Sequence, residues 1–348
     1  MSKTLKRYRV GLEWHDNKIQ ELTDLCATFE HRHYIQEILT TVVKMGLEKT
    51  DNVDLKLVNT ALKELRYSFL KLSDYRSIKK VTVFGSARTP SDHTAYLLAE
   101  EFSRRIVEEG YMVITGAGSG IMEAGNKGSS REKSFGVNIN LPFEQEANPY
   151  IDNDHKLINF NYFFTRKLIF IKESCATTVF PGGFGTMDEV FENITLFQTG
   201  KSGPRPIILM EPEGDQYWVE WENFINKSLF KQGYIGATDS HMYEICHSAE
   251  EAVDIILKFN RVYHSIRNIG RQTVLRLNYK ISEQRLKSLI EEFSHLFKGQ
   301  ELIQREALPE EVEGSEYPDL PRLVFTFEKR DYGHLKLLID RINESDRV

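Results

Sequence analysis

Three glycines lie within four positions in the segment Pro181–Thr186, which has the sequence PGGFGT and is called the glycine turn below. Gly182, Gly183 and Gly185 have no Cβ, so successive backbone N–H groups can approach a phosphate closely. A helix that begins at such a turn favours negative charge, and the Thr186 hydroxyl adds a donor. No lysine follows the glycines, so this is not the P-loop of nucleoside-triphosphate enzymes. The turn therefore predicts a monophosphate site.

A second candidate segment follows an apolar stretch near residue 84. Gly85 allows close approach of the backbone to a ligand, and Ser86 can donate or accept a hydrogen bond. Arg88, two residues later, has the charge to meet a phosphate. An ordinary turn between a strand and a helix would have the same sequence, so a binding role and a purely structural role are both open for these three residues.

A third glycine-containing segment, GAGSG, includes Gly116, Gly118 and Gly120. Its N–H groups could contact a phosphate or a ribose at a helix N-terminus. The third glycine comes one residue too early for the dinucleotide motif G-x-G-x-x-G, and Asn138 and Asn140 stand where that motif needs an acidic residue for the ribose. This spacing disfavours NAD, and we expect no cofactor.

Two charged residues near the glycine turn could take part in catalysis. Glu189 stands three residues after Thr186, which is also the spacing of a helix capping box, so a cap and a catalyst remain equal alternatives. Asp188 would favour the dipole of the same helix. Arg166 precedes the turn on a predicted helix, where most arginines are solvated, so its position alone is weak evidence.

The middle of the chain alternates strand and helix patterns, and this alternation must position the three glycine segments. It predicts a Rossmann-like, doubly wound parallel sheet, which binds ligands at the carboxyl ends of its strands. The predicted strands cover residues 81–84, 111–115, 135–139, 156–160, 176–180 and 206–210, and the predicted helices cover 93–109, 162–174, 187–198 and 218–230.

The sequence patterns differ in the two segments that flank the middle of the chain. Helical apolar spacing over residues 19–43 and 53–72 predicts a helical cap or an oligomer contact. The last part predicts a small α+β appendage with strands over 273–277, 302–306 and 322–328 and helices over 282–297 and 332–342. Its acidic loop, which holds Glu306, Glu310, Glu311, Glu313, Glu316 and Asp319, is expected to be solvated. We therefore expect three domains, covering residues 1–76, 77–263 and 264–348.

Composition limits the function classes. The 348 residues are 41% hydrophobic and 28% charged, with a net charge of −6, which disfavours general binding of nucleic acid or of an anionic membrane. Cys26, Cys175 and Cys246 are too far apart for a metal or disulfide framework. No stretch reaches the roughly 20 apolar residues of a membrane span, and the start lacks the apolar core of a secretory signal. We expect a cytoplasmic protein without a metal.

The motif PGGFGT-x-x-E, from Pro181 to Glu189 and preceded by Arg166, resembles the LONELY GUY family of cytokinin riboside 5′-monophosphate phosphoribohydrolases, also called possible lysine decarboxylases. The resemblance covers about residues 80–262. It implies that Arg166 and Glu189 are the catalytic pair and that the glycine turn binds the phosphate. It also implies a homo-oligomer, a dimer or larger.

The resemblance implies hydrolysis of a nucleoside 5′-monophosphate to a free base and ribose 5-phosphate. The segment GVNINLPFE at residues 136–144 is more similar to longer bacterial nucleotide 5′-monophosphate nucleosidases than to compact plant members, which favours AMP or a related purine nucleotide over a cytokinin. The alternative is a non-catalytic nucleotide sensor or carrier on the same fold. A decarboxylase would need pyridoxal phosphate on a lysine, and no lysine here lies in a recognisable motif for that cofactor.

Overall fold

The computed structural model describes residues 8–26, 28–141, 146–297, 301–312 and 317–347. The chain divides into two compact units, residues 1–66 and 67–348. The three-domain division that the sequence suggests stays a prediction. Within the described residues, no helix is both long enough and apolar enough to cross a bilayer.

The first unit is helical, as the apolar spacing predicts. It contains α1 (Glu13–Asp24), α2 (Arg32–Leu47) and most of α3 (Asn52–Leu72). Ile19 is the one apolar side chain among the described residues of this unit that is fully buried. The helices therefore expose most of their apolar residues in the single chain.

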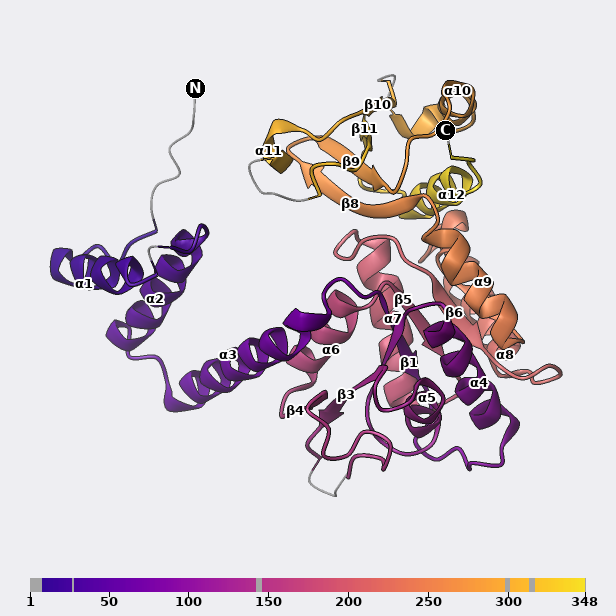
Figure 1. Ribbon diagram of the computed structural model, residues 1–348, viewed down its shortest axis with the longest axis horizontal. Coiled ribbons are helices and arrows are strands. Elements are labelled where there is room, and N and C mark those ends of the chain that lie inside the picture. Colours follow the sequence, from indigo (N-terminus) through magenta and orange to yellow (C-terminus); the bar gives the residue numbers. More distant parts are fainter. Residues whose placement is uncertain (1–7, 27, 142–145, 298–300, 313–316, 348) are drawn as a thin grey trace. The chain divides into compact units, whose positions relative to one another are not determined.

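The second unit is built on a parallel sheet of seven strands in the order β4-β3-β2-β1-β5-β6-β7 (Figure 1). Every neighbouring pair in it is parallel. The predicted Rossmann-like fold class is confirmed. The strands are β1 (Lys80–Phe84), β2 (Met112–Thr115), β3 (Ser134–Ile139), β4 (Leu157–Phe160), β5 (Ala176–Val179), β6 (Ile207–Met210) and β7 (Glu244–Cys246).

Helices connect these strands, because parallel neighbours require crossover connections. They are α4 (Thr94–Glu108), α5 (Ile121–Ser129), α6 (Phe163–Glu173), α7 (Phe184–Gln198), α8 (Tyr217–Phe224) and α9 (Ala249–Phe259). A π-helical segment, Ile225–Phe230, continues α8, and the 3₁₀ segment η3 (Ala237–Met242) leads into β7.

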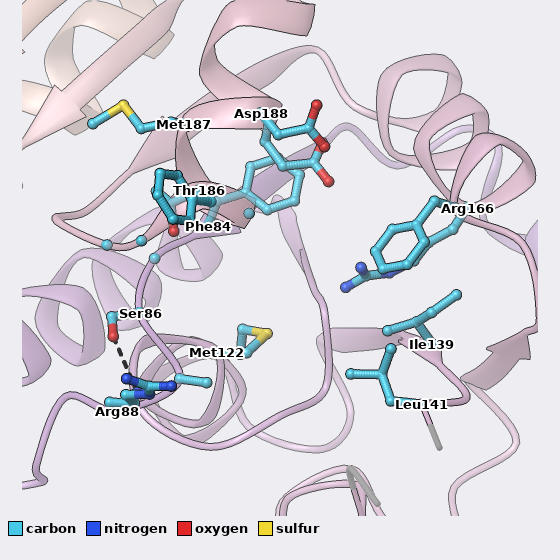
Figure 2. Close-up of a pocket in the computed structure, with 18 of the residues that line it drawn as sticks. Phe84, Ser86, Arg88, Met122, Ile139, Leu141, Arg166, Thr186, Met187 and Asp188 are labelled. Carbon is cyan, nitrogen blue, oxygen red and sulfur yellow. Dashed lines mark hydrogen bonds between the residues drawn. The ribbon is translucent and has the colours of Figure 1, made fainter. Parts of the chain in front are cut away.

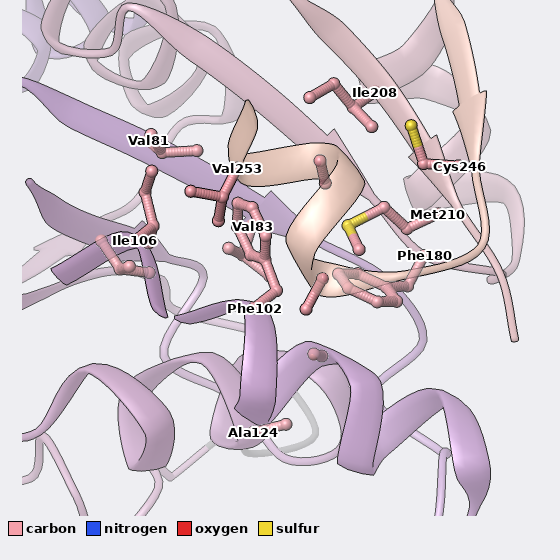
Figure 3. Close-up of a cluster of buried hydrophobic side chains, with 14 of the residues drawn as sticks. Val81, Val83, Phe102, Ile106, Ala124, Phe180, Ile208, Met210, Cys246 and Val253 are labelled. Carbon is pink, nitrogen blue, oxygen red and sulfur yellow. The ribbon is translucent and has the colours of Figure 1, made fainter. Parts of the chain in front are cut away.

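Apolar strands without alternation form the centre of the core. In β1, Val81 and Val83 point to the face that α4, α5 and α9 cover, where Phe102, Ile106 and Val253 pack against them (Figure 3). Phe84 points to the other face and contacts Phe170 of α6, with ring centroids 4.8 Å apart. Both faces of the sheet are thus buried, which explains the continuous apolar runs in the sequence.

The strand order reverses between β1 and β5. Successive strands run from β1 to β4 in one direction, and from β5 to β7 in the other. The turns after β1 and β5 lie side by side, and the backbone N–H of Ser86 donates to the carbonyl of Pro181 at 3.1 Å. Such a reversal leaves a crevice at the carboxyl edge of the sheet, which is where this fold binds ligands.

The C-terminal part of this unit is a second, antiparallel sheet in the order β10-β11-β9-β8. The sequence predicts three of its strands but misses β8, whose side chains are mostly half-buried. The elements are β8 (Tyr263–Ile269), β9 (Gln272–Leu277), α10 (Glu283–Glu292), η4 (Ser294–Phe297), β10 (Ile303–Arg305), α11 (Pro309–Val312), β11 (Arg322–Thr326) and α12 (Tyr332–Asn343).

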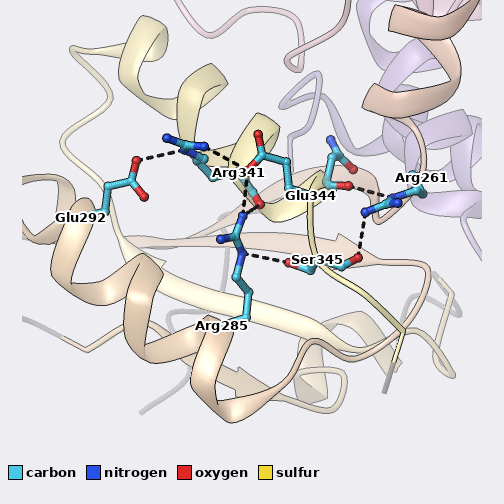
Figure 4. A network of polar contacts seen from close by, with 7 residues as sticks. Arg261, Arg285, Glu292, Arg341, Glu344 and Ser345 are labelled. Atoms are coloured by element: carbon cyan, nitrogen blue, oxygen red, sulfur yellow. Dashed lines mark hydrogen bonds and ion pairs between the residues drawn. The ribbon is translucent and has the colours of Figure 1, made fainter.

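The end of α12 is attached to its surroundings by a polar network (Figure 4). Arg261 donates from Nε to the Asn343 carbonyl at 2.8 Å and from Nη2 to the Ser345 carbonyl at 3.0 Å. Arg341 pairs with Glu292 of α10 at 3.0 Å. These contacts hold the last helix between α10 and the connection from α9 to β8.

The expectation of a solvated acidic loop is wrong for Glu311. This carboxylate is fully buried and accepts hydrogen bonds from Arg276 at 2.8 Å and from Arg322 at 3.0 Å. Burial alone would raise the pKa of Glu311, but the bonds from the two arginines hold it below its ordinary value. Glu310 is exposed as expected. Glu313 and Glu316 lie outside the described residues.

We therefore expect Glu311→Gln to lower the free energy of unfolding by about 3–5 kcal/mol, because it leaves two buried guanidinium groups facing a neutral amide. Urea denaturation would measure the change. Glu310→Gln is the matched control, and at an exposed site it should stay within about 0.5 kcal/mol of wild type. Equal stability of the two variants would contradict the importance of the buried cluster.

Candidate functional site

A cavity of about 880 Å³ opens at the carboxyl edge of the parallel sheet, where the strand order reverses. Figure 2 shows Thr186 at one side of it, Ser86, Arg88 and Met122 at another, and Arg166 beyond them. Nine of the predicted site residues line this cavity: Gly85, Ser86, Arg88, Arg166, Gly182, Gly183, Gly185, Thr186 and Glu189.

The glycine turn connects β5 to α7. Gly183 is the N-cap of α7 in an extended conformation, and no side chain of the described residues caps the helix. A Cβ on Gly182 would overlap the hydroxyl of Thr186, whereas a Cβ on Gly183 or Gly185 would meet nothing within 4 Å. The first-turn N–H groups of α7 have no partner within the helix. The turn thus combines open space with unpaired donors, as an anion site requires.

The capping-box alternative for Glu189 is wrong. A capping box would make Thr186 the N-cap, but α7 begins at Phe184, so Thr186 already lies in the first turn. The helix starts three residues before the predicted residue 187 because Gly183 can cap it without a side chain. Glu189 therefore lies in the second turn, where its side chain is not needed for capping.

Glu189 is a buried carboxylate that lines the cavity. Its side chain is 6% exposed, and its Oε2 accepts no hydrogen bond from the described residues. Burial raises its pKa to about 7, although Arg166 and Lys167 favour the charged form; Glu192 and Asp188 add to the rise. Lys167 pairs with Asp188 at 2.7 Å and with Glu192 at 3.0 Å. A carboxyl group poised near neutral pH in a cleft is a candidate acid–base or electrostatic group.

Arg166 comes from α6 and is also buried, with 8% exposure. Its Nε donates to the carbonyl of Val137 in β3 at 2.8 Å, and its guanidinium lies 5.1 Å from the ring centroid of Phe170. Burial lowers its pKa, and the charge of Glu189 opposes this effect. Guanidinium groups remain protonated in proteins, so Arg166 carries a fixed positive charge into the cavity wall.

Gly116, Gly118 and Gly120 do not line the cavity, and their contact with a ligand stays a prediction. The structure places them behind its wall. A Cβ on Gly116 would overlap the guanidinium of Arg166, and a Cβ on Gly120 would overlap the carbonyl of Ser86. Asn148 donates to the carbonyl of Gly118 at 3.0 Å. The segment supports Arg166 and the turn after β1.

Sequence reasoning misses Tyr217. Its hydroxyl donates to the carbonyl of Gly182, and its ring lines the cavity. Glu211 helps to place it, because its carboxylate accepts from the N–H of Trp218 at 2.9 Å at the start of α8. No local motif marks Tyr217. The one available signal is topological, since a loop after β6 must lie beside the turn after β5.

The remaining wall is largely apolar and was also not predicted. It includes Met122 of α5, Ile139 at the end of β3, Leu141 just after it, and Phe163 at the start of α6. Ile139 and Leu141 lie away from the glycine turn, on the side of Arg166 (Figure 2). The cavity therefore has one polar end that suits an anion and one apolar end that suits a flat or aliphatic group. No group of three or more metal-ligating side chains occurs within the described ranges.

Comparisons with known proteins relate the middle of the chain to one family. Residues 116–256 match the family model described as possible lysine decarboxylase. An 88-residue segment is 36% identical to cytokinin riboside 5′-monophosphate phosphoribohydrolase LOG1 from Arabidopsis thaliana, and it covers 25% of this chain and 39% of that protein. The resemblance to the LONELY GUY family is thereby confirmed. The match spans less than half of the relative's length.

Two solved structures cover about half of this chain. The protein TM1055 is 23% identical, with a TM-score of 0.38, over 51% of this chain and 98% of its own. The molybdenum cofactor binding protein from Rippkaea orientalis is 20% identical, with a TM-score of 0.38, over 51% of this chain and 95% of its own.

The glycine turn leads to a paired prediction. Gly182→Ala should destabilise the protein by about 1–3 kcal/mol, because its Cβ overlaps Thr186. Gly185→Ala should leave thermal stability unchanged or slightly higher, because its Cβ enters open space at the start of a helix. It should nevertheless weaken binding of inorganic phosphate, measured by calorimetry, because that space belongs to the cavity. Unchanged phosphate affinity in Gly185→Ala would argue against an anion at this turn.

Proposed function

Since the domain with this cavity resembles the LONELY GUY family, we propose that the protein hydrolyses the N-glycosidic bond of a nucleoside 5′-monophosphate. The products are a free base and ribose 5-phosphate. One observation carries the proposal: Glu189 shares one cavity with Arg166 and the glycine turn, and one oxygen of this buried carboxylate has no partner among the described residues. A site that only binds nucleotide would need the turn but not a carboxylate beside it.

The glycine turn binds the phosphate in this proposal. The N–H groups at the start of α7 and the Thr186 hydroxyl donate to its oxygens, and the helix dipole favours its charge. This end of the substrate does not react. Its binding energy is used to orient the sugar, so that C1′ lies within reach of Glu189.

Glu189 acts on the sugar. Water adds to C1′ while the bond from C1′ to the base nitrogen breaks, and the departing base takes the electron pair and acquires a proton. Positive charge builds on the sugar during this step, as in glycoside hydrolysis, and the Glu189 carboxylate stabilises it or orients the water. Arg166, which the carbonyl of Val137 holds in the cavity wall, steadies the base or the phosphate.

AMP or a related purine nucleotide is the proposed substrate class. The apolar end of the cavity, with Met122, Ile139 and Leu141, offers a surface for a base. The sequence over residues 136–144 is similar to longer bacterial nucleosidases, although residues 142–145 lie outside the described ranges. A panel of nucleoside monophosphates, assayed for base release, would establish the base preference.

We expect Glu189→Gln to lower the rate of ribose 5-phosphate release from AMP by about 10²–10³-fold, because one preorganised charge contributes about that much. The variant should still bind AMP, since the glycine turn is intact. Hydrolysis at the wild-type rate would exclude Glu189 from the reaction. A wild-type protein that binds AMP but releases no base from any nucleotide in the panel would instead be a non-catalytic sensor or carrier.

The pH profile is the control for this experiment. The reaction needs the Glu189 carboxylate, whose pKa is raised to about 7 by burial against the pull of Arg166 and Lys167. The rate in the wild type should therefore fall as the pH drops below about 7. The same limb should be absent from the residual activity of Glu189→Gln, because the amide does not titrate.

A homo-oligomer in the cytoplasm is the proposed state of the protein. Phe163, Phe164 and Leu168 of α6 are each about half exposed, and Phe184 of the glycine turn is 97% exposed. Phe164 and Leu168 share one face of α6, and exposed large apolar side chains that gather on one face are typical of an interface between subunits. Light scattering should give the mass of a dimer or larger, and a monomer at micromolar concentration would contradict this proposal.

A further inference from the structure

Helix α12 of the C-terminal part packs against the end of α7, the helix that carries Glu189. Gly200 follows α7 with a φ of +67°, and a Cβ there would overlap the phenol of Tyr332 at the start of α12. A Cβ on Gly333 would overlap the carbonyl of Thr238 in η3. Two glycines on opposite sides of this contact thus allow close approach. Tyr332 is 5% exposed.

Polar contacts join the same three elements. Gln198, the last residue of α7, donates to Asp239 of η3 at 2.6 Å. The neighbouring Thr238 donates to Asp331 at 3.0 Å, and Asp331 caps α12 by accepting from the N–H of His334 at 3.0 Å. The C-terminal end of α7 is therefore held by η3 and α12 together.

Helix α7 is also held along its length. Lys167 of α6 pairs with Asp188 at 2.7 Å and with Glu192 at 3.0 Å, and Asn193 anchors the helix to β5. Asn193 donates to the carbonyl of Glu189 at 2.8 Å, and its Oδ1 accepts from Thr177 of β5 at 3.1 Å. Along the helix axis, Glu189 lies about 6 Å to one side of this anchor and Gln198 about 7.5 Å to the other. If α7 pivots at Asn193, a displacement of about 1 Å at Gln198 moves Glu189 by about 0.8 Å.

Few contacts of the Glu189 side chain oppose such a movement. Its Oε2 accepts no hydrogen bond from the described residues, so no bond to that oxygen can hold the carboxylate in place when the backbone of α7 moves. We propose that the C-terminal part holds α7 in the position that catalysis requires, with Tyr332 as the positioning residue. The expected effect of Tyr332 on the reaction rate rests on the proposed function. The expected effect of Tyr332 on the position of α7 does not.

The test compares variants of one helix in the full chain. Tyr332→Ala should lower kcat for AMP about 10- to 100-fold, because a misplacement of about 1 Å can have an effect of that size. It should also accelerate amide hydrogen exchange in residues 184–193. Tyr332→Phe, which keeps the ring, should restore both to within about twofold of wild type.

Lys336→Met is the matched control. Lys336 lies on α12 and pairs with Glu244 of β7 at 3.2 Å and with Asp340 at 2.7 Å, but not with α7. Its kcat and its α7 exchange should equal those of wild type. If Lys336→Met changes them as much as Tyr332→Ala does, the effect is general loosening of the C-terminal part, and the proposal is wrong.

Two further readouts keep the result decisive. Gln198→Ala removes the hydrogen bond to Asp239 but leaves the buried ring of Tyr332 in place. It should therefore raise amide hydrogen exchange in α7 even if Tyr332→Ala fails to fold. In Tyr332→Ala, the acidic limb of the pH profile should move below 7, because a displaced Glu189 is more hydrated. Wild-type exchange in α7 of both variants would overturn the inference. Absence of nucleosidase activity in the wild type would overturn the proposed function alone, since exchange is measured without substrate.

Discussion

The whole site depends on two parallel strands that end side by side. The chain departs from β1 and β5 in opposite directions, so only the turns after these strands can approach each other, and the N–H of Ser86 bonds to the carbonyl of Pro181 between them. That approach leaves no room for a Cβ on Gly182. It also aims the start of α7 at the crevice, so the same geometry supplies unpaired donors and brings Glu189 to the cavity one turn later.

Burial then determines the electrostatics. Glu189 and Arg166 come from different helices and are buried together, and each favours the charged form of the other against desolvation. The carbonyl of Val137 takes one donor of Arg166 and fixes it to β3. Within the part of the chain that the structure describes, no comparable bond fixes Oε2 of Glu189. The guanidinium of Arg166 is therefore positioned by its own hydrogen bond, whereas the position of Glu189 depends on that of helix α7.

The sequence predicted much of this arrangement, and the failures have physical causes. Strand patterns predicted six of the seven strands of the parallel sheet, because the central buried strands are apolar. They missed β7, a strand of three residues at the edge of the sheet that begins with Glu244. The start of α7 was misplaced because Thr186 and Glu189 have the spacing of a cap, while Gly183 caps without a side chain. Tyr217 and the partners of Glu311 come from distant segments, so no local pattern could reveal them. Ligand contacts by individual residues stay predictions.

Gly200 and Tyr332 illustrate how such distant contacts limit sequence change. Any side chain at position 200 would have to adopt a left-handed backbone and enter the volume of the phenol, whereas a smaller residue at 332 would leave that volume empty. A substitution at either position alone would therefore reduce the packing between α7 and α12. Over evolutionary time the two segments of this unit that contribute these residues should thus be inherited together, and exchange of the C-terminal part between relatives should succeed only where both residues are transferred as a matched pair.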